Sequence, residues 1–194
     1  LALRRPVTHG LAWNVRLLAF SSAYLVWSMV AQAWAQGQVQ SALRTQGNQA
    51  QALLVTPAPL NTVLWRAVVV QGDQYLEGYY SLFDGGRPVR WTAHPRGSDL
   101  LLTQAHHPHV QRMLRFTDGL VRLRMQNGNL WLTDLRMGQE GAYVFDFDLG
   151  PPLAPGQTPQ AAVQHNQRPA MPEGLQWLWA RMWGADLAPM RATP

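Results

Sequence analysis

The feature that most constrains this chain is a long apolar stretch near its start, with no charged residue between Arg16 and Arg44. Its most apolar part is Leu17–Ala35. As a helix, these nineteen residues rise about 1.5 Å each and span about 28 Å, close to the hydrocarbon core of a bilayer at about 30 Å. We therefore expect a transmembrane helix over residues 17–36, after a basic flank over residues 1–16.

The residues around this stretch predict its orientation. Trp13 and Trp34 fall near its two ends, where tryptophan prefers the interface between lipid and water. Arginines are more numerous before the stretch than after it, with Arg4, Arg5 and Arg16 on one side and Arg44 on the other. Because cytoplasmic flanks carry the excess of basic residues, we expect the folded part on the periplasmic side of a bacterial inner membrane, with the lipid bilayer as its partner.

Two other interpretations of the stretch stay open. Polar residues dilute it, which also fits a buried helix of a soluble protein: Ser21, Ser22, Ser28 and Gln32. Ala33-Trp34-Ala35 followed by Gln36 resembles a signal-peptidase site after a short apolar core. The chain begins with Leu1 instead of Met, so we expect it to be part of a longer protein.

The basic charge lies beside the apolar stretch and not on the rest of the chain. The net charge of +5 divides into +4 over residues 1–60, zero over residues 61–150 and +1 over residues 151–194. A nucleic-acid-binding domain carries its basic surface on the fold itself, so we expect no nucleic-acid partner. The basic residues are all arginine and the chain has no cysteine, which excludes Schiff-base chemistry, a disulfide framework and a thiolate metal site within it.

Composition divides the remainder into a stalk, a domain, a linker and a last helix. Residues 37–52 are rich in glutamine and small side chains, which is typical of a polar helical stalk. Residues 151–172 hold six prolines, which is typical of a linker. Residues 173–188 include a Trp-rich amphipathic helix, which can lie on the membrane or pack on the domain. Residues 53–150 are left as the extramembrane domain.

The first β-hairpin of this domain runs from Thr62 to Phe83. A Gly-Asp dipeptide at positions 72 and 73 suits its turn, because glycine is preferred at the first position of a type II′ turn. This register pairs Arg66 with Tyr79 and brings Glu77 diagonally opposite Arg66, close enough for an ion pair. One face is apolar and is expected to form the core: Val63, Trp65, Ala67, Val69, Leu76, Tyr80 and Leu82.

The second β-hairpin runs from Leu120 to Met137. Its turn is Asn-Gly at positions 127 and 128, the strongest short hairpin signal. The register pairs Val121 with Asp134, so that Asp134 and Arg136 point to the same side as the apolar residues. Two charged residues are therefore expected where the pattern otherwise predicts burial.

The remaining elements complete an α+β fold. A helix is expected between the hairpins, from His107 to about Thr117, and a last strand over Ala142–Leu149. The predicted architecture is one transmembrane helix followed by a small antiparallel sheet with one or two packed helices.

Several short blocks between residues 56 and 150 resemble one known family. They include Thr56-Pro57-Ala58-Pro59-Leu60-Asn61, Tyr79-Tyr80-Ser81-Leu82, Phe116-Thr117-Asp118-Gly119 and Thr133-Asp134-Leu135-Arg136-Met137-Gly138. In this order they resemble the extramembrane C-terminal half of the YdjM-like inner-membrane proteins, known as membrane-bound metal-dependent hydrolases. The resemblance implies membrane residence, hydrolysis of an unknown substrate, and a divalent metal bound by an upstream, His-rich half that this chain lacks.

Histidines offer a metal site within the chain itself. The candidate ligands are His94, His106, His107 and His109, with Asp99 nearby. Three of them would suffice for a catalytic zinc with an open position. Their spacing matches no HExxH motif and puts no two of them on one helical face, which favours an exposed loop before a helix. Asp146 and Asp148, two apart on the last strand, could share a cation or face solvent.

Arg66, Asp134 and Arg136 form a second candidate site, because each lies in a strand that otherwise reads as buried. A buried aspartate must be paired and hydrogen-bonded, so we expect Asp134 to pair with Arg136 or Arg66. The three residues could bind an anion or a substrate, or they could be a structural network that fixes the register. No Gly-x-Ser-x-Gly motif accompanies them, and the catalytic residues stay unassigned.

Two functions therefore stay open. The chain is the membrane-anchored extramembrane domain of a metal-dependent hydrolase, or it is a non-catalytic, membrane-tethered module for sensing or protein interaction. Clustered His and Asp on upstream membrane segments would favour the first.

Overall fold

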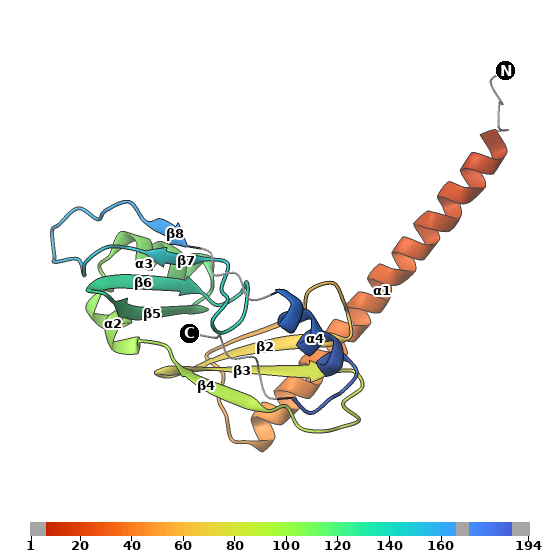
Figure 1. The fold of residues 1–194 in the computed structure, drawn as a ribbon, viewed down its shortest axis with the longest axis horizontal. Coiled ribbons are helices and arrows are strands. Elements are labelled where there is room, and N and C mark those ends of the chain that lie inside the picture. The colour runs from red at the N-terminus through yellow and green to blue at the C-terminus, as the bar shows by residue number, and fades with distance from the viewer. Residues whose placement is uncertain (1–6, 166–170, 188–194) are drawn as a thin grey trace.

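A long apolar helix leads into two antiparallel sheets in the computed structural model, which describes residues 7–165 and 171–187 (Figure 1). The helices are α1 (Val7–Thr45), α2 (Ser98–Thr103), α3 (Pro108–Phe116) and α4 (Met171–Met182). The strands are β1 (Ala52–Pro57), β2 (Leu64–Gln71), β3 (Gln74–Ser81), β4 (Trp91–Pro95), β5 (Val121–Gln126), β6 (Asn129–Asp134), β7 (Asp146–Asp148) and β8 (Val163–His165). The α+β class is confirmed, with two four-stranded sheets instead of one. Arg4 and Arg5 of the basic flank lie outside the described residues.

Helix α1 passes through two environments along one unbroken length. From Leu11 to Val30 its apolar side chains are exposed, and this part belongs to a helix that is long and apolar enough to be a membrane anchor or a signal sequence. Beyond Val30, one stripe with helical spacing is buried against the first sheet: Ala31, Ala35, Val39, Ala42 and Leu43. Residues 37–45 of the expected stalk are therefore part of the domain core, and burial begins before the expected end of the span at residue 36.

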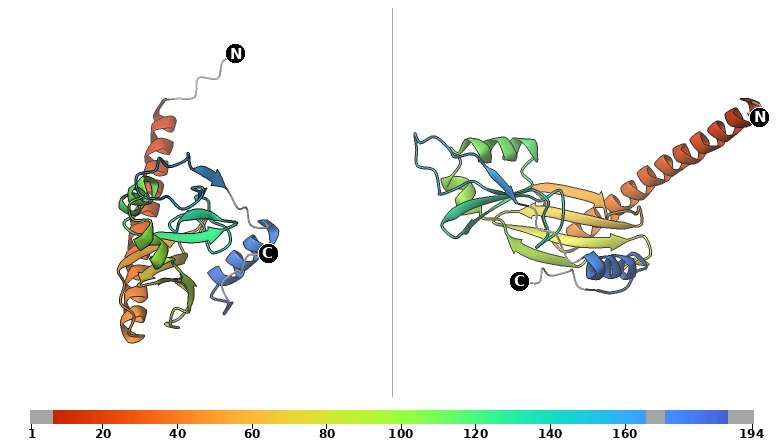
Figure 2. Two further views of the ribbon diagram at one scale, coloured as in Figure 1. Left: turned by 90° about the vertical axis from the view of Figure 1, so that its left-hand side faces the viewer. Right: turned by 45° about the horizontal axis from the view of Figure 1, so that its top comes forward.

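The first sheet is an antiparallel meander in the order β1-β2-β3-β4. The predicted register of its central hairpin is confirmed, with Arg66 opposite Tyr79. Its expected core face packs against α1. The opposite face of β2 and β3 is buried as well, beneath residues 135–143 and α4. Figure 2 shows α1 and α4 on opposite sides of this sheet.

The second sheet has the order β5-β6-β7-β8 and carries α2 and α3. The register predicted from the Asn-Gly turn is confirmed, with Val121 opposite Asp134. Helix α3 begins at Pro108 and ends at Phe116, within a residue of the prediction. Apolar residues of α2 and α3 pack with Leu123 and Leu132 to form the core of this half.

Two segments differ from the sequence predictions, and a third, the Trp-rich helix, takes one of its two expected placements. The last strand, expected over Ala142–Leu149, is limited to β7, because residues 135–143 leave the second sheet and cover the first one. Part of the expected linker forms β8, which pairs with β7, while its residues 166–170 lie outside the described residues. The Trp-rich helix is α4, which packs on the first sheet: Trp177, Leu178 and Met182 contact a cluster of Ala58, Leu64 and Tyr79.

Candidate functional site

A buried ion pair joins the two strands at the centre of the first sheet. The Arg66 Nε donates to Glu77 Oε1 at 2.5 Å, and the two side chains are 5% and 2% exposed. The other guanidinium nitrogens of Arg66 donate to the Leu135 carbonyl at 2.8 Å and to the Tyr143 hydroxyl at 3.3 Å. Burial alone would lower the pKa of Arg66, but Glu77, Tyr143 and Tyr79 together outweigh it and raise that pKa, so the guanidinium stays charged.

A second, shallower ion pair lies beside the first. The Arg122 Nη1 donates to Glu140 Oε1 at 2.9 Å, and the Tyr75 hydroxyl donates to the same carboxylate. Burial by itself would raise the pKa of Glu140, but the Tyr75 hydroxyl and Arg122 hold that pKa below its usual value. Burial and the Glu140 charge raise the pKa of Tyr75, which therefore stays protonated at neutral pH. The Tyr143 hydroxyl, 3.4 Å from that of Tyr75, links the two pairs.

These two pairs form a closed network, in which each charged group faces a partner. Such an arrangement fixes the packing of residues 135–143 on the first sheet, because removing either partner would leave a buried charge. It contains no nucleophile next to a free base, so the geometry supports a structural role for Arg66. The sequence already indicated Glu77 as its diagonal neighbour.

The three residues of the predicted anion site do not come together. Asp134 pairs with Arg136, as one of the two expected pairings, with the Arg136 Nη2 at 2.8 Å from Asp134 Oδ2. Arg66 lies on the first sheet, and the Leu135 carbonyl is its link to this segment. The Asp134 hydrogen bond is the main reason why the pKa of Arg136 is raised. Asp134 is the last residue of β6 in the second sheet, whereas Arg66 lies on β2 in the first sheet. The Asp134 carboxylate and the Arg66 guanidinium therefore belong to different sheets.

The candidate metal ligands do not converge on one point either, although the rings of His107 and His109 lie 5.4 Å apart. His94 lies on β4, where its ring stacks on Tyr75 at 5.2 Å between centroids. The ring nitrogens of His106 and His109 bond to the carbonyls of Leu153 and Gln160, and His107 caps α3 by accepting from the His109 backbone N–H. Among residues 7–165 and 171–187, no group of three or more His, Cys, Asp or Glu is arranged to hold a metal ion. The donors present therefore do not fit the metal implied by the resemblance.

The acidic pair on β7 is engaged with its own sheet. Asp146 pairs with Arg124 at 2.5 Å and accepts from the Thr133 hydroxyl at 2.7 Å. Asp148 accepts from the Asn129 side-chain amide at 2.8 Å. The two carboxylates therefore hold neighbouring strands and turns, and neither is directed at a shared cation.

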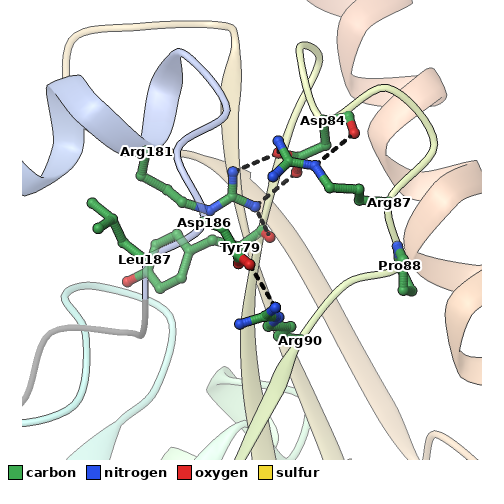
Figure 3. A pocket seen from close by; sticks show the side chains of 8 residues that line it. All are labelled: Tyr79, Asp84, Arg87, Pro88, Arg90, Arg181, Asp186 and Leu187. Atoms are coloured by element: carbon green, nitrogen blue, oxygen red, sulfur yellow. Dashed lines mark hydrogen bonds and ion pairs between the residues drawn. The ribbon is translucent and has the colours of Figure 1, made fainter.

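A small cavity lies between the turn after β3 and the segment after α4 (Figure 3). Its volume is about 140 Å³. Arginine and aspartate dominate its lining, which comprises Tyr79, Asp84, Arg87, Pro88, Arg90, Arg181, Asp186 and Leu187. Sequence reasoning missed this cavity because its two walls are almost a hundred residues apart and share no motif.

The floor of the cavity is rigid. Arg181 makes a bidentate ion pair with Asp84, with nitrogen to oxygen distances of 2.6 and 2.7 Å, and it donates to the Tyr79 carbonyl at 2.8 Å. Asp84 also accepts from the Ser81 backbone N–H at 2.8 Å. Planar, bidentate pairing of this kind is among the stronger polar interactions in proteins, and it locks α4 to the turn after β3.

The mouth of the cavity is less constrained. Arg90 pairs with Asp186 at 2.6 Å, but the two side chains are 70% and 50% exposed, so water screens the pair. Arg87 is half exposed and donates to the Asp84 and Gly184 carbonyls. A small anion could therefore reach the exposed guanidinium group of Arg90 only in competition with Asp186. Comparison with family models, curated proteins and solved structures found no match to this chain.

Proposed function

We propose that this chain is the extramembrane domain of a membrane-anchored, metal-dependent hydrolase, held on the periplasmic side of a bacterial inner membrane. The observation that carries the anchoring is α1, whose exposed apolar part continues without a break into the buried stripe that begins at Ala31. A helix shared in this way sets the distance between domain and bilayer. The excess of arginine before the span supports the periplasmic location.

The hydrolase part of the proposal rests on the resemblance of the blocks within residues 56–150 to the YdjM-like inner-membrane proteins. Because the described histidines do not fit a metal centre, the metal would be held by a part of the protein outside this chain. In this proposal the domain contributes no catalytic residue of its own. Its role is to stand at a fixed position beside the membrane part that carries the chemistry.

Metal content tests the hydrolase proposal. The chain and a longer protein that includes the native upstream segments would be purified in the same detergent, and bound divalent metal measured by mass spectrometry. We expect metal in the longer protein and none above background in the chain alone. A longer protein that carries no metal and contains no clustered His and Asp would contradict the proposal and favour the non-catalytic alternative.

Single cysteines test the topology, because the chain has none of its own. Gln126→Cys lies at the exposed end of β5, beside the hairpin turn, and Thr8→Cys lies before the span. With a membrane-impermeant maleimide on intact spheroplasts, we expect labelling at position 126 and, at position 8, labelling only after permeabilisation. The reverse pattern would place the domain in the cytoplasm.

A second candidate function, a membrane-tethered sensing module, is favoured by the exposed ion pair at the mouth of the cavity. Displacement of Asp186 from Arg90 would free a guanidinium for an anionic ligand. Calorimetric titration with inorganic phosphate tests this binding, with Arg90→Gln as the variant and Arg112→Gln, exposed on α3, as the control. Loss of the heat of phosphate binding in Arg90→Gln, but not in Arg112→Gln, would support a sensing role.

A further inference from the structure

Four large apolar side chains at one end of the domain are exposed and remain without cover. They are Leu60, Phe83, Trp179 and Trp183, with 98%, 52%, 64% and 57% of their surface exposed. The rings of Phe83 and Trp183 are stacked at 5.2 Å, and Trp179 meets Trp183 edge to face at 5.8 Å. We call these four residues the apolar rim. An exposed apolar cluster of this kind marks an interaction surface.

The apolar rim lies at the end of the first sheet from which α1 departs. The Trp27 indole of α1 donates to the Thr62 hydroxyl at 3.2 Å, which holds the loop between β1 and β2 against the exposed part of the helix. The Val63 carbonyl accepts from the Leu82 N–H at 3.0 Å, so the turn that carries Phe83 is at the same end. In Figure 1 this loop lies beside the middle of α1, and α4 lies at the same end of the sheet but on its opposite face (Figure 2).

The loop that presents Leu60 is held rigidly. The Asn61 side chain accepts from the Val63 and Leu64 N–H groups at 3.0 and 2.7 Å and donates to the Pro59 carbonyl at 3.1 Å. Leu60 itself has a φ of 63°, a conformation that is unfavourable for a leucine. A strained backbone conformation and an almost fully exposed apolar side chain therefore coincide at Leu60.

Helix length places the bilayer surface at this level. The exposed part of α1 from Leu11 to Val30 spans about 30 Å at about 1.5 Å per residue, the thickness of a hydrocarbon core. Its one charged residue, Arg16, is close enough to its start for the guanidinium to extend to the headgroups of the N-terminal side. One boundary then falls near Val30, beside the bond between Trp27 and Thr62. Tryptophan prefers this zone, because its ring is apolar and its N–H stays hydrated.

We propose that the apolar rim is a second membrane contact, which seats the end of the first sheet in the lipid interface beside the span. The occupant is the bilayer itself and not a partner protein, because Thr62, two residues from Leu60, is hydrogen-bonded to Trp27 in the exposed apolar part of α1. Leu60 enters the lipid, while the aromatic side chains lie at the level of the headgroups. This inference rests on the anchoring proposed for α1 but not on the hydrolase assignment.

Depth measurement on the full chain tests the proposal. A nitroxide label would be attached to Leu60→Cys, to Leu25→Cys in the exposed part of α1, and to Asp73→Cys, an exposed turn at the other end of the same sheet. Each protein would be reconstituted in vesicles of phosphatidylcholine and phosphatidylglycerol. Spin relaxation by oxygen, which concentrates in lipid, is then compared with relaxation by a water-soluble nickel chelate.

We expect oxygen to exceed the nickel chelate several-fold at positions 25 and 60, and the opposite at position 73. A label at position 60 that is as accessible to nickel as the one at position 73 would overturn the proposal while leaving the anchor intact. So would a label shielded from both reagents, which would indicate a protein partner. Nickel access at position 25 would overturn the anchor as well. Thermal unfolding close to that of the parent chain shows that each variant is folded.

Discussion

Arg66 and Glu77 are both buried, and their charges face each other instead of water. Loss of this pair is therefore expected to destabilise the domain. Glu77→Ala removes the carboxylate and leaves the guanidinium buried without a counter-charge, which should lower the free energy of unfolding by on the order of 3–5 kcal/mol. Asp186→Ala breaks an exposed pair and should cost less than about 1 kcal/mol. Urea unfolding in detergent measures both. Equal effects would mean that the inner pair is hydrated.

His107 makes the stability depend on pH near neutrality. Burial, together with the neighbouring charges of His109 and His106, lowers its pKa below the usual value of about 6.5, so the unfolded chain takes up a proton before the folded one. The contribution is fully present above pH of about 6.5 and is lost as the pH falls toward the folded pKa. A single proton contributes at most about 1.4 kcal/mol per pH unit.

Substitution isolates this contribution. His107→Asn keeps an acceptor for the His109 N–H at the start of α3 but does not titrate, so it should flatten the loss of stability between about pH 7 and pH 5. His165→Asn, at an exposed position on β8, should leave the slope in place. Midpoints of urea unfolding, measured across this pH range, test the prediction. An unchanged dependence of the midpoint on pH in His107→Asn would exclude His107 as the titrating group.

The sequence predicted individual polar residues better than their partners. Asp134 was expected to pair with Arg136 or Arg66, and its pairing with Arg136 is local, two residues away on the chain. The partner of Arg66 could be found because a hairpin register brings Glu77 near. The cavity around Asp84 and Arg181 could not, since only tertiary packing of α4 brings these residues together.

Gly97 lies between β4 of the first sheet and α2 of the second, and a side chain at this position would clash with the backbone of β5. Its φ is 77°, and a Cβ atom there would lie 2.1 Å from the Leu123 carbonyl oxygen on β5. Gly97→Ala should therefore destabilise the domain by more than the roughly 1–2 kcal/mol that a positive φ alone costs. Gly128→Ala is the matched control, since Gly128 has a φ of 80° and open space around it.

The difference between the two alanine variants measures the contact between the sheets. Thermal unfolding should show a lower midpoint for Gly97→Ala than for Gly128→Ala. Similar midpoints would mean that the second sheet can shift relative to the first without loss of stability.

Elements with local signals were predictable, and elements defined by their neighbours were not. The turns at 72–73 and 127–128 set both hairpin registers, because glycine and asparagine favour the positive φ that those turns require. Strand β1 lies in a stretch without a turn signal and depends on pairing with β2. Residues 135–143 have no such signal, and they cover the first sheet because Arg66 donates to the Leu135 carbonyl there and the Glu140 N–H donates to Glu77.

The folded unit begins inside α1, and truncation should reveal this. A chain that starts at Ala31 keeps the buried stripe and should be soluble, with a cooperative thermal transition. A chain that starts at Leu53 exposes the face of the first sheet that contains Trp65 and Val69, and it should aggregate. Circular dichroism and size-exclusion chromatography distinguish the two. If the chain that starts at Leu53 unfolded cooperatively and stayed monomeric, the contact of α1 with the first sheet would not be needed for folding.

In the anchored arrangement proposed above, α1 is shared between lipid and the domain core, and this constrains how the protein can be removed from a cell. A protease that cuts after Ala35, at the small residues before Gln36, would strip Ala31 and Ala35 from the first sheet and leave Val39 on a shortened stub. Shedding of an intact ectodomain is thereby disfavoured, because the cut that frees it also opens its interior. Turnover should therefore proceed by extraction and degradation of anchor and domain together.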